Sequence, residues 1–389
     1  MPLSLPEYVR RRESGTSGPG TLAPYFAACI AVAIAYIAMR MLHPMPIFPL
    51  DDPYITLHSA QVLHWGFDPN YPGISPLYGT TSAPFLSLVY LLLFALPPLF
   101  ALDTACWLGV LLYTFGLVRL ARTFRLTRAE ELCFVILGLT ASFIPFHLVN
   151  GLETSWALAG VVWTLALGSG KSDEWKWAAV VAGLTASVRP DLLPFAALVV
   201  VALTFQSYRA HNCLRETMVR AISFASLALF AILPWALWYY HTTGVPFPLT
   251  GLAKRYFVGG DNLAWRDKAD TAAYALTVYL GSCGPLVLAP PKVARHPLGK
   301  AVLLSFVLFV AAIYIQFPIT LAWNQFRYPI VLTPMMLWAI GLSMTAPEER
   351  ARQQTGRIAS CMHGLLAGIS PLLHPFLSTR VQLLQYRPA

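Results

Sequence analysis

The sequence has few charged residues for its length. Only 12% of its 389 residues are Asp, Glu, Lys or Arg, whereas soluble domains contain about 25%. Hydrophobic residues make up 57% of the chain and the mean hydropathy is +0.58. A chain of this composition has too few polar groups to cover its surface, which argues strongly against a water-soluble fold.

Spacings typical of metal sites and disulfide frameworks are also missing. The six cysteines are scattered, nearly all inside apolar runs, with no Cys-x-x-Cys pair. His58 and His64 are six residues apart, which does not place them on one helical face, so no zinc site is predicted. We therefore predict no metal ligands and leave a divalent cation open as a cofactor.

The net charge of +9 does not indicate a nucleic-acid partner, because the basic residues form short clusters between apolar runs rather than one basic module. These clusters are better read as signals of membrane topology. The partners that this composition favours are membrane lipids.

Apolar runs of about 20 residues, the length that crosses the hydrocarbon core as a helix, recur from Thr21 almost to the end. The alternating pattern of barrel strands does not occur, so the spans are expected to be helices. We predict an all-α polytopic membrane protein with about 10–12 transmembrane helices. The clearest spans are residues 21–42, 101–121, 130–149, 153–169, 175–189, 192–207, 220–241, 271–289, 300–317 and 329–346.

The positive-inside rule orients these spans. If the short apolar segment 83–96 does not cross, 18 of the 27 Lys and Arg residues fall on one side and seven on the other, and the remaining two, Arg380 and Arg387, are in the C-terminal tail. Letting it cross would scatter the basic clusters between both sides. We therefore predict that 83–96 is a re-entrant or interfacial helix in the first outer loop.

This topology divides the chain into three parts. Residues 1–20 are expected to form a cytoplasmic tail, in which Arg10 to Arg12 precede an uncleaved first span. Residues 21–346 form the membrane domain, with long outer loops at 43–100 and 242–270. Residues 347–389 form a C-terminal tail, whose segment 358–377 either spans the membrane or lies on its surface.

The unusual ionisable residues on the outer side come from separate segments of the chain. They are Asp51 and Asp52 after the first span, Glu153, Arg189 with Asp191, Lys254 with Arg255, and Arg327. Charged residues at membrane depth are costly and are functional candidates by default. We therefore predict that these segments converge on one site.

Asp51 and Asp52 precede a predicted helix that includes residues 54–63. One reading makes the pair catalytic, because a carboxylate can take a proton from an attacking hydroxyl. The other makes it a helix cap, since Asp is a preferred capping residue. The two readings are compatible, because a cap also fixes the side chain.

The basic residues of this set are candidates for binding a phosphate, because Arg can bind it bidentately and Lys supplies a point charge. They are Arg189, Lys254, Arg255 and Arg327. The alternative is contact with lipid headgroups from helix ends. Arg189 precedes Pro190 and Asp191 at a helix junction, which favours a fixed role, while Glu153 is expected to cap its helix or orient a site residue.

Several short motifs follow one another over residues 20–345. They are Asp51-Asp52-Pro53-Tyr54-Ile55-Thr56-Leu57, Gly79-Thr80-Thr81-Ser82-Ala83-Pro84, Gly151-Leu152-Glu153-Thr154, Arg189-Pro190-Asp191, Gly244-Val245-Pro246-Phe247-Pro248 with Lys254, and Phe326-Arg327-Tyr328-Pro329. In this ordered set the chain resembles the GT-C superfamily of polyprenyl-phosphate-dependent glycosyltransferases. It is most similar to the bacterial DD-x-Y-I transferases, which include the mycobacterial terminal arabinofuranosyltransferase.

The resemblance implies a GT-C-like bundle in a bacterial cytoplasmic (inner) membrane, with its active site facing the periplasm or exterior. The donor would be a polyprenyl-phosphate-linked sugar, and the acceptor a hydroxyl of a glycan, lipid or protein. Asp51 would be the general base beside Asp52, and Arg189 and Lys254 would hold the donor phosphate. Tyr54, Glu153 and Asp191 would support the site.

Two other functions fit a polytopic chain. A transporter or flippase for a lipid-linked or small polar substrate would use broken helices and charges near the middle of its spans. Here the charges gather at one face and no inverted repeat is evident. A noncatalytic membrane assembly subunit would leave the ordered charged motifs unexplained.

Overall fold

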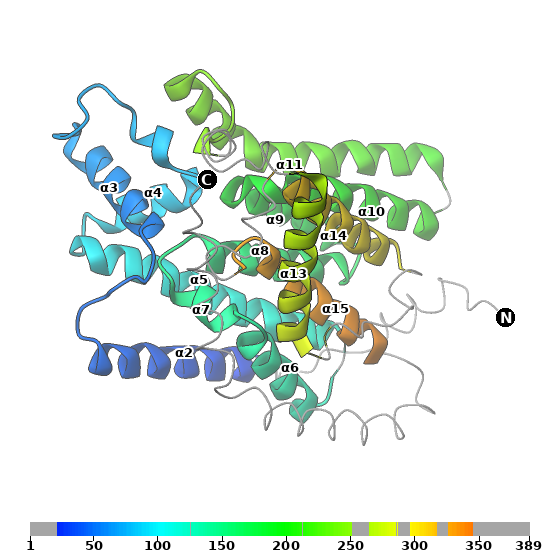
Figure 1. The fold of residues 1–389 in the computed structure, drawn as a ribbon. Coiled ribbons are helices and arrows are strands. Elements are labelled where there is room, and N and C mark those ends of the chain that lie inside the picture. Colours follow the sequence, from blue (N-terminus) through cyan, green and yellow to red (C-terminus); the bar gives the residue numbers. More distant parts are fainter. Residues whose placement is uncertain are drawn as a thin grey trace. The chain divides into compact units, whose positions relative to one another are not determined.

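The computed structural model describes residues 22–344, apart from 125, 212, 251–263, 285, 287–295 and 317–325. Within these residues there are thirteen α-helices and no strand (Figure 1). The predicted all-α class is therefore confirmed. The predicted tails, 1–20 and 347–389 with segment 358–377, lie outside the described residues.

Four helical segments are long and apolar enough to cross a membrane. They include α2 (Ala23–Leu42), α5 (Pro98–Thr123), α10 (Leu193–His211) and α11 (Leu214–Thr243). Twenty residues of α-helix extend over about 30 Å, the thickness of the hydrocarbon core. These helices indicate a multi-pass membrane protein.

The centre of the bundle is made by α5, α8 (Thr154–Gly168), α9 (Trp175–Val188) and α11, which pack on one another in that order. Small residues set the approach of these helices. A Cβ added at Gly183 of α9 would lie 2.3 Å from the carbonyl oxygen of Ala228 in α11. Such glycines allow close backbone contact, as is common between membrane helices.

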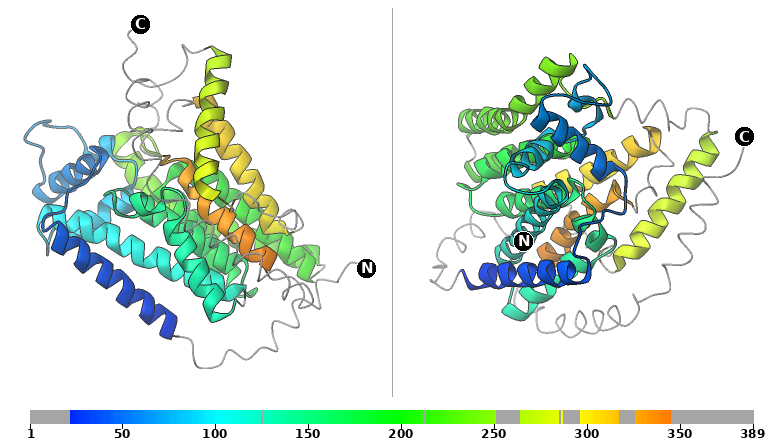
Figure 2. Two further views of the ribbon diagram at one scale, coloured as in Figure 1. Left: turned by 60° about the horizontal axis from the view of Figure 1, so that its bottom comes forward. Right: turned by 90° about the vertical axis from the view of Figure 1, so that its left-hand side faces the viewer.

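Helices α2 and α5 run in opposite directions (Figure 2). Tyr25 contacts Phe115 with ring centroids 5.4 Å apart, and Tyr36 contacts Trp107 at the same separation. The chain between the two helices therefore begins and ends at the same end of the bundle. The helix inside it, α4 (Ala83–Leu92), has ten residues and a length of about 15 Å, which is too short for a span.

The predicted single span 130–149 is wrong. The structure has two helices there, α6 (Arg128–Thr140) and α7 (Ile144–Val149). Ser142 between them has a positive φ of 53°. Pro145 explains the break, because proline has no backbone N–H to donate to the carbonyl four residues earlier and its ring clashes with that carbonyl.

The remaining elements complete the bundle. They are α3 (Asp52–Trp65), α13 (Trp265–Cys283), α14 (Pro297–Gln316), α15 (Leu332–Met344) and the 3-10 turns η1 (Pro76–Gly79), η2 (Pro190–Leu192) and η7 (Pro329–Val331). Helix α13 begins and ends about six residues before the predicted span 271–289.

The directions of the central helices define two ends of the bundle. Trp156 and Trp163 of α8 donate to carbonyls seven residues apart in α5, at 2.8 and 2.9 Å, so α5 and α8 are parallel. At the far end of α5, Arg119 pairs with Glu174, which directly precedes α9. We call this second end the basic end, and the end where α5 and α8 begin the site end.

Candidate functional site

Arg327 joins two distant segments at the site end. It donates from Nη1 to Oδ2 of Asp52 at 2.5 Å and from Nη2 to Oε1 of Glu153 at 2.6 Å. These partners are 275 and 174 residues away in the sequence. Arg327 and Glu153 are both buried. Three of the segments predicted to converge therefore meet at one guanidinium.

Arg189 adds a fourth segment. It donates from Nε and Nη2 to the carboxylate of Asp191, at 3.1 and 2.5 Å, and from Nη1 to the backbone carbonyl of Arg327 at 3.0 Å. Its guanidinium also lies 5.5 Å from the ring centroid of Tyr328, within the range of a cation–π contact. Pro190 explains this position, since the residue before a proline adopts extended backbone and α9 ends there.

Phe326 sets the direction of Arg327. Its φ is +62°, which is uncommon for a residue with a side chain. Its ring packs at 5.0 Å from that of Phe143 and at 6.1 Å from that of Tyr279. This packing holds a turn in which the Arg327 side chain faces the two carboxylates while its carbonyl faces Arg189.

Gly151 brings the loop before Glu153 against the start of α3. Its φ is +88°, and an added Cβ would lie 2.6 Å from the Phe48 ring and 2.7 Å from Pro53. Both the backbone conformation and the space therefore require glycine. The short distance between this loop and α3 lets Glu153 and Asp52 share Arg327.

Asp51 differs from the other carboxylates, because it is exposed and accepts one hydrogen bond, from the backbone N–H of Asp52 at 3.0 Å. A capping side chain normally accepts from the second or third helical residue. Pro53 is the second residue here and has no N–H. Asp51 is thus the N-cap residue of α3, and its carboxylate stays open to solvent.

Electrostatics keep the buried carboxylate ionised. Burial acts to raise the pKa of Glu153, but Arg327 and Arg189 outweigh it, so the pKa lies below the ordinary value of 4.5. Burial acts to lower the pKa of Arg327, and Glu153 with Asp52 and Tyr328 raises it. The site is therefore charged on both sides.

The predicted phosphate clamp remains a prediction. Arg189 and Arg327 already donate to carboxylates, so a phosphate could bind bidentately at Arg189 only if Asp191 moved away. Lys254 and Arg255 lie outside the described residues.

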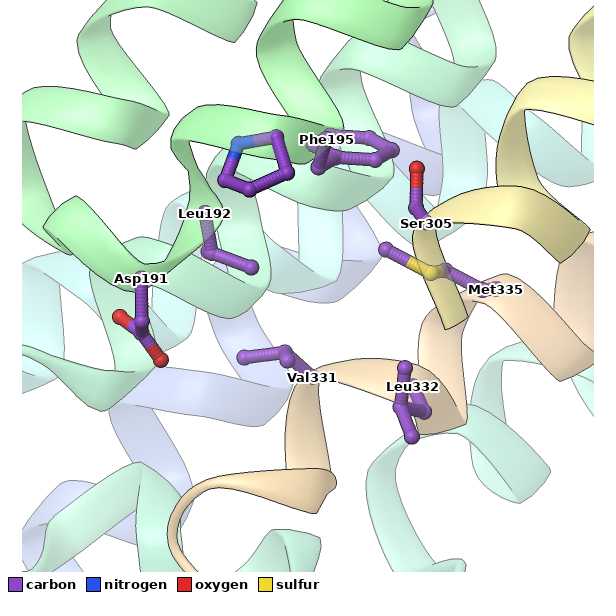
Figure 3. A pocket seen from close by; sticks show the side chains of 8 residues that line it. Asp191, Leu192, Phe195, Ser305, Val331, Leu332 and Met335 are labelled. Carbon is purple, nitrogen blue, oxygen red and sulfur yellow. The ribbon is translucent and has the colours of Figure 1, made fainter. Parts of the chain in front are cut away.

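A small pocket lies beside the Arg189–Asp191 pair (Figure 3). Its lining residues come from η2, α10, α14, η7 and α15. They are Asp191, Leu192, Pro194, Phe195, Ser305, Val331, Leu332 and Met335. Apart from Asp191 and Ser305 the walls are apolar, so the pocket suits an apolar group next to an ion pair.

No group of three or more His, Cys, Asp or Glu side chains that could hold a metal occurs in the described part of the chain. The carboxylates of Asp52, Glu153 and Asp191 bind guanidinium groups instead.

Two tyrosines near the site end differ in their exposure to solvent. Tyr54 is half-exposed, and its hydroxyl accepts from the backbone N–H of Phe48 at 3.3 Å. Tyr239 is buried and donates to the carbonyl of Thr80 at 3.0 Å, which ties α11 to the Gly79–Pro84 motif. No sequence signal reveals this last contact, because its partners are 159 residues apart.

The fold and this site define a helical, multi-pass membrane protein in which buried ion pairs join distant segments at one end of the bundle. Comparisons with protein-family models, curated proteins and solved structures find no match.

Proposed function

We propose that this protein transfers a glycosyl residue from a polyprenyl-phosphate donor to a hydroxyl group of a glycan, lipid or protein acceptor. The reaction takes place on the outer face of a bacterial inner membrane. The main support is one observation: Asp51 is open to solvent directly beside Asp52, which is paired with the buried Arg327–Glu153 ion pair. The motif order along the chain supports the same proposal.

The chemistry needs one base and one stabilised leaving group. Asp51 accepts the proton of the acceptor hydroxyl while the oxygen of that hydroxyl forms a bond to the anomeric carbon of the donor sugar. The bond from that carbon to the phosphate oxygen breaks, and its electron pair leaves with the polyprenyl phosphate. Cations then stabilise the phosphate charge.

Asp52, Arg327 and Glu153 are positioning residues in this scheme. Asp52 is held by its ion pair with Arg327, which leaves the neighbouring Asp51 as the free base. Because Asp52 is the first residue of α3, fixing it also fixes the direction of Asp51. A base held in place in advance lowers the cost of reaching the reactive geometry.

In this proposal Arg189 and Lys254 hold the donor phosphate, and Arg255 and Arg327 are the further cations of the clamp. The membrane part would be a GT-C-like bundle of about 10–12 spans, and α4 would lie at the outer interface. Since α2 and α5 run in opposite directions, both Asp51 and α4 belong to a segment that returns to the same side.

The test is a transfer assay with purified full-length protein in lipid nanodiscs, using a panel of polyprenyl-phosphate sugars and hydroxyl acceptors. We expect transfer from at least one donor, and Asp51→Asn should reduce it by at least ~100-fold. Asn caps helices about as well as Asp, so the fold should be kept. Asp173→Asn, at an exposed aspartate before α9, is the matched control.

Full activity of Asp51→Asn would remove Asp51 as the base. Loss of transfer in Asp52→Asn alone would reverse the roles within the pair. Release of the intact sugar-lipid on the other side of a vesicle, without transfer, would support a flippase instead.

A further inference from the structure

One face of α3 is exposed and begins at the proposed base. Asp51, Tyr54, Ile55 and His58 follow the spacing i, i+3, i+4 and i+7, which places them on one side of the helix. Tyr54 and Ile55 are 41% and 45% exposed. The opposite side of α3 is buried against the bundle. The helix therefore presents a mixed aromatic and polar face next to Asp51.

The loop after α3 folds back onto this face. Nε2 of His58 lies 3.0 Å from Oδ2 of Asp68. The other carboxylate oxygen of Asp68 accepts from the backbone N–H groups of Asn70 and Tyr71, at 2.8 and 3.1 Å. These bonds keep Tyr71 near His58, and its ring is exposed.

A second loop contacts the same face one turn nearer to Asp51. A Cβ added at Gly79 would lie 3.3 Å from the Ile55 side chain, so η1 rests directly on α3. Tyr78, the residue before Gly79, is 45% exposed. We call the exposed surface of Asp51, Tyr54, Ile55, His58, Tyr71 and Tyr78 the platform.

The charge of residues 43–100, which contain the platform, determines whether a charged or an uncharged ligand is favoured. Residues 43–100 contain no Lys and no Arg, while Asp51 and Asp68 contribute carboxylates. Asp52 is neutralised by Arg327. Within residues 43–100 an anionic ligand would therefore meet carboxylates and no Lys or Arg side chain, which opposes its binding.

The same surface has groups that suit uncharged sugars. Aromatic rings carry partial negative charge on their faces, against which the C–H groups of a sugar ring pack favourably. Carboxylates and the imidazole accept hydrogen bonds from sugar hydroxyls. Aromatic faces beside acceptor groups therefore match an uncharged glycan better than a phosphate-bearing one.

We infer that the platform binds an uncharged glycan chain and presents its hydroxyl to Asp51 as the acceptor. This inference rests on the proposed function for the role of Asp51, and binding itself does not require a donor. It narrows the acceptor from a glycan, lipid or protein to a glycan without charge.

The test is equilibrium binding, with no donor present, to the full chain in nanodiscs of zwitterionic lipid. The probes are linear uncharged pentose and hexose oligosaccharides and, for comparison, a uronate oligosaccharide of equal length. We expect an uncharged probe to bind best, and Tyr54→Ala and Tyr78→Ala each to weaken its binding by roughly 3- to 10-fold. Tyr208→Ala is the control, since Tyr208 is 44% exposed in the last part of α10.

The outcomes separate the platform from the transferase proposal. The platform is supported if an uncharged glycan binds to the wild type and binds more weakly to both tyrosine variants, even if no transfer occurs. Transfer to an acceptor with unchanged binding and KM in both variants overturns the platform while the transferase stands. Tighter binding of the uronate probe than of the uncharged probes also overturns the platform. Equal binding of the uncharged probe by wild type and all variants overturns it too, and would fit tyrosines that lie among lipid headgroups.

Discussion

Ion pairs occur at both ends of the helix bundle, but their surroundings differ. At the basic end, Arg119 pairs with Glu174 while its side chain stays 35% exposed. At the site end, the Arg327 side chain is 5% exposed and pairs with two carboxylates. The basic-end pair is one of several such partly exposed pairs.

This difference separates topology signals from site residues. Exposed pairs contribute about 0–1 kcal/mol, because water and salt screen them. Buried pairs cost desolvation, and removing one partner leaves an uncompensated charge. Burying Arg327 and Glu153 therefore adds little to stability, so we expect the function to lie at the site end.

The largest difference between the two ends should be whether an introduced cysteine can be labelled from outside the cell. We expect a membrane-impermeant thiol reagent to label Asp68→Cys from outside intact cells and not to label Lys171→Cys. Position 68 is in the segment between α2 and α5, and position 171 is next to the basic end. The comparison requires a background in which the exposed Cys133 and Cys213 are replaced.

Labelling of Lys171→Cys from outside, with no labelling at position 68, would invert the orientation. It would place the proposed chemistry in the cytoplasm.

The largest effect on stability is expected for Arg327→Ala. It leaves Glu153 buried without a cation and removes the partner of Asp52, so the free energy of unfolding should fall by about 3–5 kcal/mol. Unfolding in mixed detergent measures this change. The double variant Arg327→Ala, Glu153→Gln should recover part of the loss, because it removes the unpaired charge; no recovery would mean that packing, not charge, explains it.

A smaller and pH-dependent effect is expected for Glu153→Gln. Because the pKa of Glu153 is lowered in the folded protein, its stabilisation is present above the ordinary value of 4.5 and is lost as pH falls through the lower folded value. At pH 7 the variant should lose about 1–3 kcal/mol, and its difference from wild type should narrow in acid. Denaturation curves from pH 7 to 3 give the comparison, with exposed Glu216→Gln as control; a constant difference would contradict it.

The sequence predicts the helices well where a single apolar run has clear ends. The predicted spans 153–169 and 175–189 match α8 and α9 within a residue. The span 130–149 is wrong because hydrophobicity alone does not register the turn at Ser142. Hydropathy measures transfer into lipid, and backbone breaks at proline need a separate signal.

The meeting of Asp52, Glu153, Arg189 and Arg327 follows from topology, because each lies at a helix end on the same predicted side. Their pairing does not follow. Nothing in the spacing indicates that Arg327 forms ion pairs with both Asp52 and Glu153. Nor does it indicate that Arg189 donates to the backbone carbonyl of Arg327. Those choices depend on the turn at Phe326, which only packing in three dimensions fixes.

The smallest effect is expected for Arg119→Ala at the basic end. Arg119 and Glu174 are 35% and 21% exposed, so either group can be solvated when its partner is removed, and the loss should be about 0–1 kcal/mol. The same unfolding assay at low and high salt measures it, and salt should shrink the difference further. A loss as large as that of Arg327→Ala would mean that burial does not distinguish the two ends, and burial would then give no reason to expect the function at the site end.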